Sequence, residues 1–167
     1  MKKIIFVTFI ALFAANSMAQ TKPLPTVDVD GKKIQVLNMD AKGRVAWGGY
    51  TQIGAAVRSE NDGAANTKAI VAAVGNNAGF DNKPYAASLC GALKANGFED
   101  WYLPSVNELK GLFASLKAIG LGEKNTYWSS TEVNGTQAAT VYMYDGSLYN
   151  VAKVNDNHYV CVRKADK

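Results

Sequence analysis

The amino-acid sequence predicts an α+β fold in which two helices pack on short antiparallel strands. Helical periodicity is clearest in the middle of the chain, from about residue 84 to residue 116. Alternating apolar and polar residues, typical of half-buried strands, stand on both sides of this region. Two cysteines, Cys90 and Cys161, stand in the first helical segment and in the last alternating segment. One disulfide is therefore expected to connect a helix to a strand.

The first 19 residues are typical of a signal peptide. Met1-Lys2-Lys3 precedes an apolar run from Ile4 to Ala15 that is too short for a membrane anchor, and small residues stand three and one positions before Gln20. We expect cleavage after Ala19 and export to the periplasm, the cell surface or the medium; an uncleaved anchor is the alternative. Residues 20–26 then form an extended lead-in, and residues 27–167 form a single domain.

The charge pattern excludes one class of partner. Cleavage removes Lys2 and Lys3, which leaves 16 basic residues scattered among 14 acidic ones. A nucleic-acid binder concentrates its lysines and arginines on one face. We expect no nucleic-acid partner, and no later apolar run is long enough to span a membrane.

The N-terminal half begins with β structure. Val27 to Val36 predicts two short strands around the turn dipeptide Asp30-Gly31. Arg44 to Val57 is a second stretch that favours β structure and contains Trp47-Gly48-Gly49-Tyr50. Glu60 to Asn82 is rich in Asn, Gly and Ala, with a short helix expected from Thr67 to Val74.

Two amphipathic helices are expected in the middle. The first carries Ala86, Leu89, Cys90 and Leu93 at helical spacing, and Gly97 is its expected stop. The second begins after Pro104 with a capping box, in which Ser105 caps the free amides and Glu108 reaches back. The apolar face of this second helix comprises Val106, Leu109, Leu112, Phe113 and Leu116.

The C-terminal third predicts a series of antiparallel strands. Its expected strands are Tyr127–Thr131, Ala139–Tyr144, Leu148–Val154 and His158–Arg163, with turns at Asp145-Gly146 and Asn155–Asn157. Export delivers Cys90 and Cys161 to an oxidising compartment, where a pair of cysteines forms a disulfide; two buried free thiols are the alternative. Closing that loop of 71 residues stabilises the fold by roughly 4 kcal/mol on the chain-entropy model.

The residue inventory excludes several catalytic sites. His158 is the single histidine, and in a strand its side chain points away from that of Cys161, three residues later. One histidine and two cysteines do not complete a structural zinc site, and no phosphate-binding glycine loop is present. Two of the 14 acids could still converge as in a glycosidase, although no spacing nominates a pair.

Tyrosines and amides gather near the C-terminus instead. We nominate Tyr142, Tyr144, Tyr149, Asn155, Asp156 and Asn157 as ligand-binding residues. Tyr supplies rigid contact area with a polar tip, and Asn and Asp bind sugars or peptides or coordinate calcium. In the alternative interpretation the tyrosines cover a sheet and the Asn-Asp-Asn run is a turn.

Three motifs in order resemble a bacterial family. They are Asp100-Trp101-Tyr102-Leu103-Pro104-Ser105 with Asn107-Glu108-Leu109, then Tyr127-Trp128-Ser129-Ser130-Thr131-Glu132, and finally Tyr159-Val160-Cys161-Val162-Arg163. Gly63 to Thr67 and Ala86 to Cys90 resemble its longer members. This is the family typified by the C-terminal domain of collagen-like adhesins (Lcl C-terminal type), and the resemblance extends over most of Val27 to Arg163.

The resemblance implies a C-type-lectin-like fold, related to the formylglycine-generating enzyme, in secreted or surface proteins. Some relatives are adhesins, and others present a ligand face on the C-terminal strands, here about Thr140 to Tyr159. The signature would preserve the fold, with Trp101 and Leu103 as core anchors and Trp128 in the sheet core. Its remaining members here are Pro104, Ser105, Glu108 and Arg163.

Departures from the related folds limit what is carried over. No proline stands in a calcium loop of the Glu-Pro-Asn kind, and Asn155-Asp156 matches half of the second calcium motif. We therefore expect no cofactor, with calcium as the alternative although its motif is incomplete. Oxygenase activity would need cysteines that a disulfide occupies.

The sequence thus predicts an exported, non-enzymatic binding or adhesion module that recognises a glycan or protein partner through its C-terminal hairpin. A structural component of a surface assembly is the second hypothesis. A carbohydrate hydrolase is the third.

Overall fold

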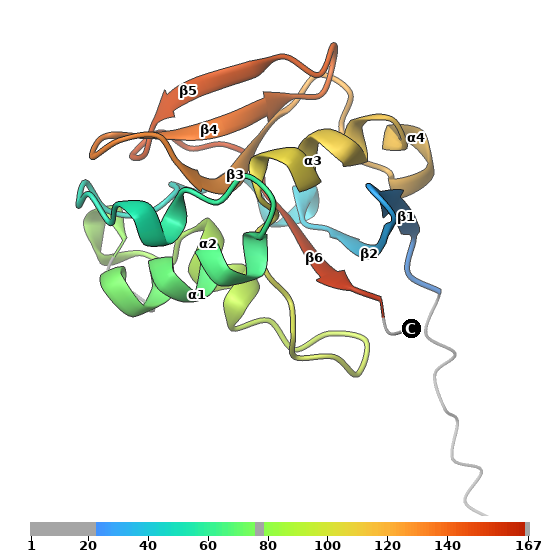
Figure 1. The fold of residues 1–167 in the computed structure, drawn as a ribbon, viewed down its shortest axis with the longest axis horizontal. Helices are drawn as coiled ribbons and strands as arrows, with labels where there is room; N and C mark the ends of the chain where they lie inside the picture. The colour runs from blue at the N-terminus through green and yellow to red at the C-terminus, as the bar shows by residue number, and fades with distance from the viewer. Residues whose placement is uncertain (1–22, 76–78, 166–167) are drawn as a thin grey trace, which may run out of the picture.

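The fold consists of two three-stranded antiparallel sheets with helices around them (Figure 1). It is a computed structural model that describes residues 23–75 and 79–165. The first sheet has the order β1 (Thr26–Val29), β2 (Lys32–Asn38), β6 (Val160–Lys164). The second has the order β3 (Thr126–Glu132), β4 (Gln137–Tyr142), β5 (Leu148–Ala152). The predicted α+β class is confirmed, whereas the likeness to C-type lectins stays a prediction and the signal peptide lies outside the described residues.

The first sheet joins the two ends of the described chain. Asp30 and Gly31 adopt positive φ angles of 51° and 78°, as a two-residue hairpin turn requires, so the predicted β1–β2 hairpin is confirmed. β2 then pairs with β6, which places Gln35 opposite Arg163. The C-terminal strand therefore completes a sheet that the N-terminal hairpin begins.

Four α-helices occur in the described part of the chain. They are α1 (Gly63–Val74), α2 (Ala86–Gly91), α3 (Val106–Phe113) and α4 (Leu116–Ile119). α1 begins earlier than the short helix expected from Thr67, because the Asp62 side chain accepts a hydrogen bond from the Ala65 N–H and caps it. α2 ends at Gly91, before the expected stop at Gly97.

The predicted capping box of α3 is confirmed. The Ser105 hydroxyl accepts from the Glu108 N–H, and the Glu108 carboxylate accepts from the Ser105 N–H at 2.9 Å. The chain turns at Ala114 and Ser115, so Leu116 belongs to α4 and not to the same helix. α3 lies between the two sheets and buries Val106, Leu109 and Leu112 (Figure 1).

The β structure predicted for Arg44 to Val57 is wrong. This segment is irregular apart from one bridge between Val45 and Asn157 and a 3-10 turn at Ala55–Val57. Gly54 adopts a φ of 88°, which breaks an extended run. The segment instead places the Trp47 ring, which is wholly buried, in the core. The backbone N–H of Trp47 donates to the Lys153 carbonyl at 2.8 Å.

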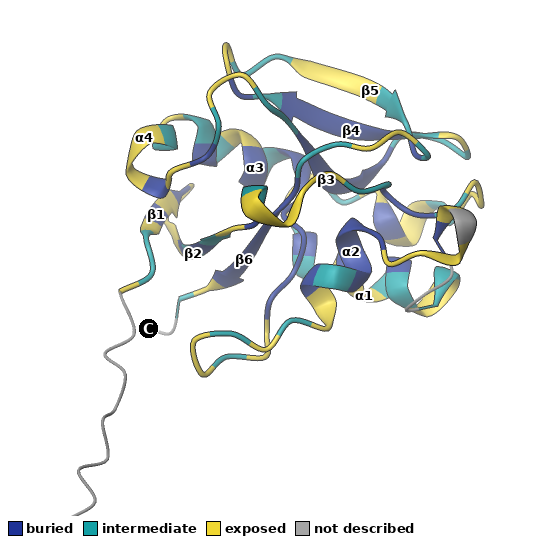
Figure 2. Cartoon of the chain, turned by 180° about the vertical axis from the view of Figure 1, so that it is seen from behind, coloured by how far each residue is buried: buried dark blue, intermediate teal, exposed yellow. Residues whose placement is uncertain are grey.

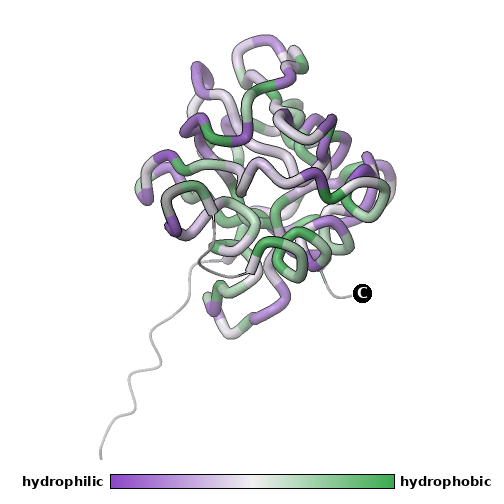
Figure 3. Tube along the Cα trace, turned by 90° about the vertical axis from the view of Figure 1, so that its left-hand side faces the viewer, coloured by the Kyte–Doolittle hydropathy of each residue, from purple (hydrophilic) through white to green (hydrophobic). Residues whose placement is uncertain are grey.

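The buried residues form two clusters. One lies between the first sheet, α3 and β4, and the other surrounds Trp47, Tyr85, Trp101 and Trp128. In Figure 2 the central strands are buried, whereas β5 carries exposed positions. Figure 3 shows the most hydrophilic stretches mainly in peripheral loops. Within residues 23–75 and 79–165, no helix is long and apolar enough to cross a membrane.

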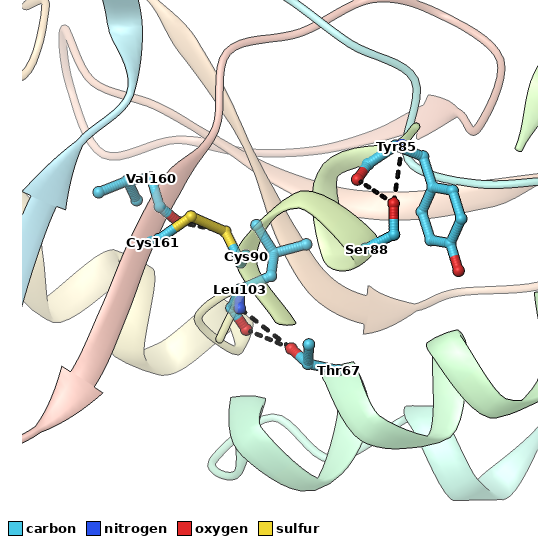
Figure 4. The surroundings of a disulfide bond; sticks show 7 residues. All are labelled: Thr67, Tyr85, Ser88, Cys90, Leu103, Val160 and Cys161. Atoms are coloured by element: carbon cyan, nitrogen blue, oxygen red, sulfur yellow. Dashed lines mark hydrogen bonds between the residues drawn. A yellow bond between two sulfur atoms is a disulfide. The ribbon is translucent and has the colours of Figure 1, made fainter. Parts of the chain in front are cut away.

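The predicted disulfide is confirmed. Cys90 of α2 and Cys161 of β6 are bonded, both wholly buried, with their Cα atoms 5.3 Å apart (Figure 4). Near this bond, the Thr67 hydroxyl donates to the Leu103 carbonyl and accepts from the Leu103 N–H (Figure 4). The disulfide thus attaches α2 to β6, and the Thr67 contacts attach α1 to the chain that precedes α3.

Candidate functional site

Three tyrosines form one exposed aromatic surface at the β4–β5 hairpin. Tyr142 ends β4, Tyr144 lies in the turn and Tyr149 lies on β5. The Tyr142 ring centroid is 6.0 Å from that of Tyr144 and 6.5 Å from that of Tyr149. Tyr144 is 65% exposed and Tyr149 is 51% exposed. We call these three residues the tyrosine cluster.

Strand pairing explains why these rings meet. Thr140 pairs with Tyr149, and side chains two residues apart on a strand share a face, so Tyr142 and Tyr149 project from the same side of the sheet. The turn after Tyr142 is held by the Gly146 N–H, which donates to the Tyr142 carbonyl at 2.9 Å. The hairpin therefore presents the rings on a regular backbone rather than on a free loop.

A hollow of about 380 Å³ borders the cluster. Its lining is uncharged and consists of Thr126, Tyr142, Tyr149, Asn150, Val151 and Asn157. Aromatic faces beside hydroxyl and amide groups suit a ligand with apolar faces and polar edges, such as a sugar ring or a peptide.

A second and larger hollow lies beside Tyr144. Its volume is about 620 Å³, and Tyr144 and Met143 form one wall. The corner between α3 and α4 forms the opposite wall, with Phe113 and Leu116 as its large apolar side chains and Lys117 at its rim. A ligand that extends past Tyr144 would meet this mixed surface.

The Asn155–Asn157 run is divided by the fold. Asn157 lines the uncharged hollow, and its backbone exchanges two hydrogen bonds with Val45. Asn155 is in a turn, where its N–H donates to the Ala152 carbonyl. Asp156 lines a separate hollow beside Arg44 and Phe80. The structure thus groups the three nominated tyrosines with Asn157, but not with Asn155 or Asp156.

A buried ion pair holds the end of the hairpin. The Lys153 ammonium lies 2.6 Å from Glu132 Oε1, and both side chains are wholly buried. Lys153 also donates to the Thr51 carbonyl at 3.0 Å and lies 4.6 Å from the centre of the Trp47 ring. The end of β5 is therefore fixed both to β3 and to the irregular segment.

The Glu132 carboxylate is fully engaged. Its two oxygens accept from the N–H groups of Ile53 and Gly54, at 2.9 and 2.7 Å. Burial alone would raise the pKa of Glu132, but these hydrogen bonds and the contact with Lys153 lower it below its ordinary value. Glu132 therefore stays charged in the fold, where it serves as an anchor.

A second polar group joins the first sheet region to β3. The Tyr127 hydroxyl donates to the Asp40 carboxylate, at 2.6 Å from Oδ1, and accepts from the Gly122 N–H. Burial and the Asp40 charge raise the pKa of Tyr127 above its ordinary value. His158 Nδ1 lies 3.2 Å from Asp40 Oδ1, outside hydrogen-bonding geometry. Among the described residues, no three of His, Cys, Asp or Glu are grouped to hold a metal ion.

Comparison with known families assigns the chain. The model described as the Lcl C-terminal domain matches residues 38–163, well over half of the sequence. The chain belongs to the Lcl C-terminal domain family. No curated protein shows a significant match. The match includes the tyrosine cluster, the disulfide and the Glu132–Lys153 pair, while β1 and most of β2 precede it.

The signature residues of this Lcl C-terminal domain lie in its interior. Trp101, Leu103 and Trp128 are buried, and the Trp128 indole N–H donates to the Val45 carbonyl at 2.8 Å. Pro104 precedes the α3 cap, and its carbonyl accepts from the Ser130 N–H. These residues join β3 to the segments around it.

Two charged signature residues are also structural. The Glu108 carboxylate accepts from the N–H groups of Ser105 and Gly63. The Arg163 guanidinium donates to both carboxylate oxygens of Asp100, at 2.7 and 3.0 Å, and holds the pKa of that carboxyl below its ordinary value. Neither Glu108 nor Arg163 lines a hollow beside the tyrosine cluster.

Sequence reasoning missed the Glu132–Lys153 pair. Lys153 directly follows β5 and continues the alternation that places Tyr149 and Val151 on one face. A lysine at such a position only weakly indicates a buried acidic partner. The carboxylate that meets it lies 21 residues earlier, and only the packed fold brings the two together.

Proposed function

We propose that this Lcl C-terminal domain is an exported, non-enzymatic binding or adhesion module that holds a glycan or protein partner against the tyrosine cluster. One observation carries the proposal: three tyrosine rings gather on one face of the hairpin, and two of them are more than half exposed. Clusters of solvent-exposed aromatic side chains are typical of recognition surfaces.

The fixed backbone of the hairpin strengthens the proposal. A ligand that meets a preformed surface loses little free energy to the ordering of loops. Here the ladder between β4 and β5 and the buried Lys153 fix the backbone that carries Tyr142 and Tyr149. Binding would then require only adjustment of the side chains.

The non-enzymatic part of the proposal rests on how the buried acids are used. Glu108 and Glu132 are almost completely buried, and each accepts hydrogen bonds from two backbone N–H groups. Carboxylates committed in this way are poor general acids or bases, since they neither reach solvent nor exchange partners readily.

The test is a binding array of glycans and extracellular-matrix proteins, probed with the mature protein from residue 20 onward. We expect specific binding that survives a calcium chelator and is lost when Tyr142, Tyr144 and Tyr149 are all changed to alanine. The matched control changes Tyr50 and Phe80, an exposed aromatic pair outside the cluster, with ring centroids 6.2 Å apart. Circular dichroism verifies that both variants fold.

Two results would remove the proposal. One is binding that the triple variant retains at full strength, and the other is loss of binding in the control alone. An array with no specific signal would favour the second hypothesis, a structural component of a surface assembly.

A further inference from the structure

The outer edge of β5 is open. β5 is the last strand of its sheet, and Figure 1 shows it as the outermost strand, with no neighbour beyond it among the described residues. Leu148 is 49% exposed, and Asn150 is exposed as well. The strand reads Leu-Tyr-Asn-Val-Ala and holds no charge and no proline.

The hydrogen bonds between β4 and β5 show which backbone groups of β5 face outward. The Tyr142 N–H donates to the Ser147 carbonyl, and the Lys153 N–H donates to the Thr136 carbonyl. In an antiparallel pair these contacts occur at every second residue, so Tyr149 and Val151 bond to β4. Leu148, Asn150 and Ala152 therefore direct their N–H and C=O groups away from the sheet.

The other sheet edges in the described part of the chain are protected. β1 has four residues and carries Asp28, which is paired with Lys33 at 2.8 Å. β6 is covered by Tyr102, which exchanges two backbone hydrogen bonds with Val162. β3 is covered where the Trp128 N–H donates to the His158 carbonyl. Charge, shortness and cover are the usual protections of an edge strand, and β5, with five residues, has neither charge nor cover in the described part of the chain.

We infer that β5 pairs antiparallel with β5 of a second copy of this chain, about a two-fold axis at Asn150. In this register Leu148 of one copy faces Ala152 of the other, and the two Asn150 residues face each other. Every outward N–H of the strand then meets an outward C=O, because the outward residues are symmetric about Asn150. Tyr149 pairs across the strands with Val151, an aromatic and a β-branched residue, which is a favourable pair.

The strand's neutrality favours a second copy as the occupant. Like charges placed directly opposite each other destabilise a strand pair, and self-pairing normally brings like charges together. β5 has no charge to oppose itself. A charged peptide, in contrast, would find no counter-charge on this strand. Two-fold symmetric pairing is also the commonest way in which identical chains associate.

The dimer would have a functional consequence, which rests on the proposed function. Residues opposite each other in an antiparallel pair lie on the same side of the sheet. Both tyrosine clusters would therefore face the same side of one continuous six-stranded sheet. A repetitive surface would be held at two points, which raises apparent affinity without any new contact.

The experiment is sedimentation equilibrium of the mature protein over a hundredfold range of concentration, without ligand. We expect a monomer–dimer equilibrium and a several-fold weaker association for Asn150→Lys, which places two like charges opposite each other. Asn155→Lys is the matched control, since it adds the same charge on the turn beyond the strand and should associate like the original protein. Amide hydrogen exchange should slow with concentration at Leu148 and Asn150, whereas Tyr149 and Val151 are protected throughout.

Three results would overturn the inference. They are a monomer at every concentration, an unchanged dimer in Asn150→Lys, or a dimer whose added protection lies away from β5. If the protein stays monomeric and an added extended peptide slows amide exchange in β5, the strand pairs with a different protein instead of a second copy. Ligand binding by a strictly monomeric protein would refute the dimer and leave the proposed function intact.

Discussion

Changing Glu132 to glutamine should greatly weaken the fold. The substitution keeps the shape of the side chain but leaves the Lys153 ammonium, 2.6 Å away and wholly buried, without its counter-charge. Its amide group would also turn an N–H donor toward the N–H of Ile53 or Gly54. Removing one partner of a buried ion pair costs about 3–5 kcal/mol. The stability of a domain is about 5–15 kcal/mol, so at least about a fifth of the free energy of unfolding would be lost.

Urea unfolding followed by circular dichroism measures this loss. With a slope of about 2 kcal/mol per molar urea, the midpoint should fall by roughly 2 M. Glu99→Gln is the control, because Glu99 and Lys94 are 2.9 Å apart but both exposed, and an exposed pair contributes at most about 1 kcal/mol. Adding Lys153→Met to Glu132→Gln should restore part of the stability, since no buried charge then remains.

The same variant should change the response to acid. The pKa of Glu132 is lowered in the fold, so its contribution is present above the ordinary pKa of 4.5 and disappears as the pH falls through the lower folded value. The original protein should lose this part of its stability on acidification, and Glu132→Gln should not. A loss below about 1 kcal/mol at neutral pH, or an identical acid profile, would refute the reasoning about the buried pair.

Three further outcomes are expected. Cys161→Ser should lower the free energy of unfolding by about 2–5 kcal/mol, and reductant should weaken only the original protein. Gly63→Ala should destabilise by about 1–3 kcal/mol, because a Cβ there would lie 2.5 Å from the Ser105 nitrogen, whereas Gly135→Ala should be nearly neutral. Burial raises the pKa of Tyr85 to about 12, so Tyr85 alone should contribute a loss of about 1.4 kcal/mol per pH unit between pH 10 and about 12, as the unfolded chain ionises first.

Each of these has a contrary result. Equal urea midpoints with and without reductant would show that the disulfide contributes little. A Gly63→Ala variant as stable as Gly135→Ala would mean that α1 and the α3 cap can move apart at little cost in free energy. If Tyr85→Phe leaves the alkaline profile unchanged, the loss above pH 10 belongs to other tyrosines.

The sequence predicted best where the interaction is local. The Asp30-Gly31 turn and the Ser105–Glu108 cap depend on residues at most three positions apart, so their residue types nearly determine the geometry. The disulfide is a long-range exception, since the chain offers its two cysteines only each other.

Long-range contacts decided what could not be predicted. Arg44 to Val57 has strand-like residues, but its backbone is used to reach Lys153 and Asn157, more than 100 positions away. The tyrosine cluster was foreseeable because a hairpin brings nearby residues together. The exclusion of Asn155 and Asp156 from it depends on which way one turn points, and alternation of residue types does not encode that.

The pairing of β2 with β6 has a consequence for how the protein is made. Gln35 meets Arg163 across 128 positions, so the first sheet and the disulfide both require nearly the whole chain. Contacts of such large separation form late, and the chain lacks them until synthesis is almost complete. A chain that ends before Cys161 would have neither closure. The last strand to be synthesised is therefore the one that completes both the first sheet and the covalent cross-link.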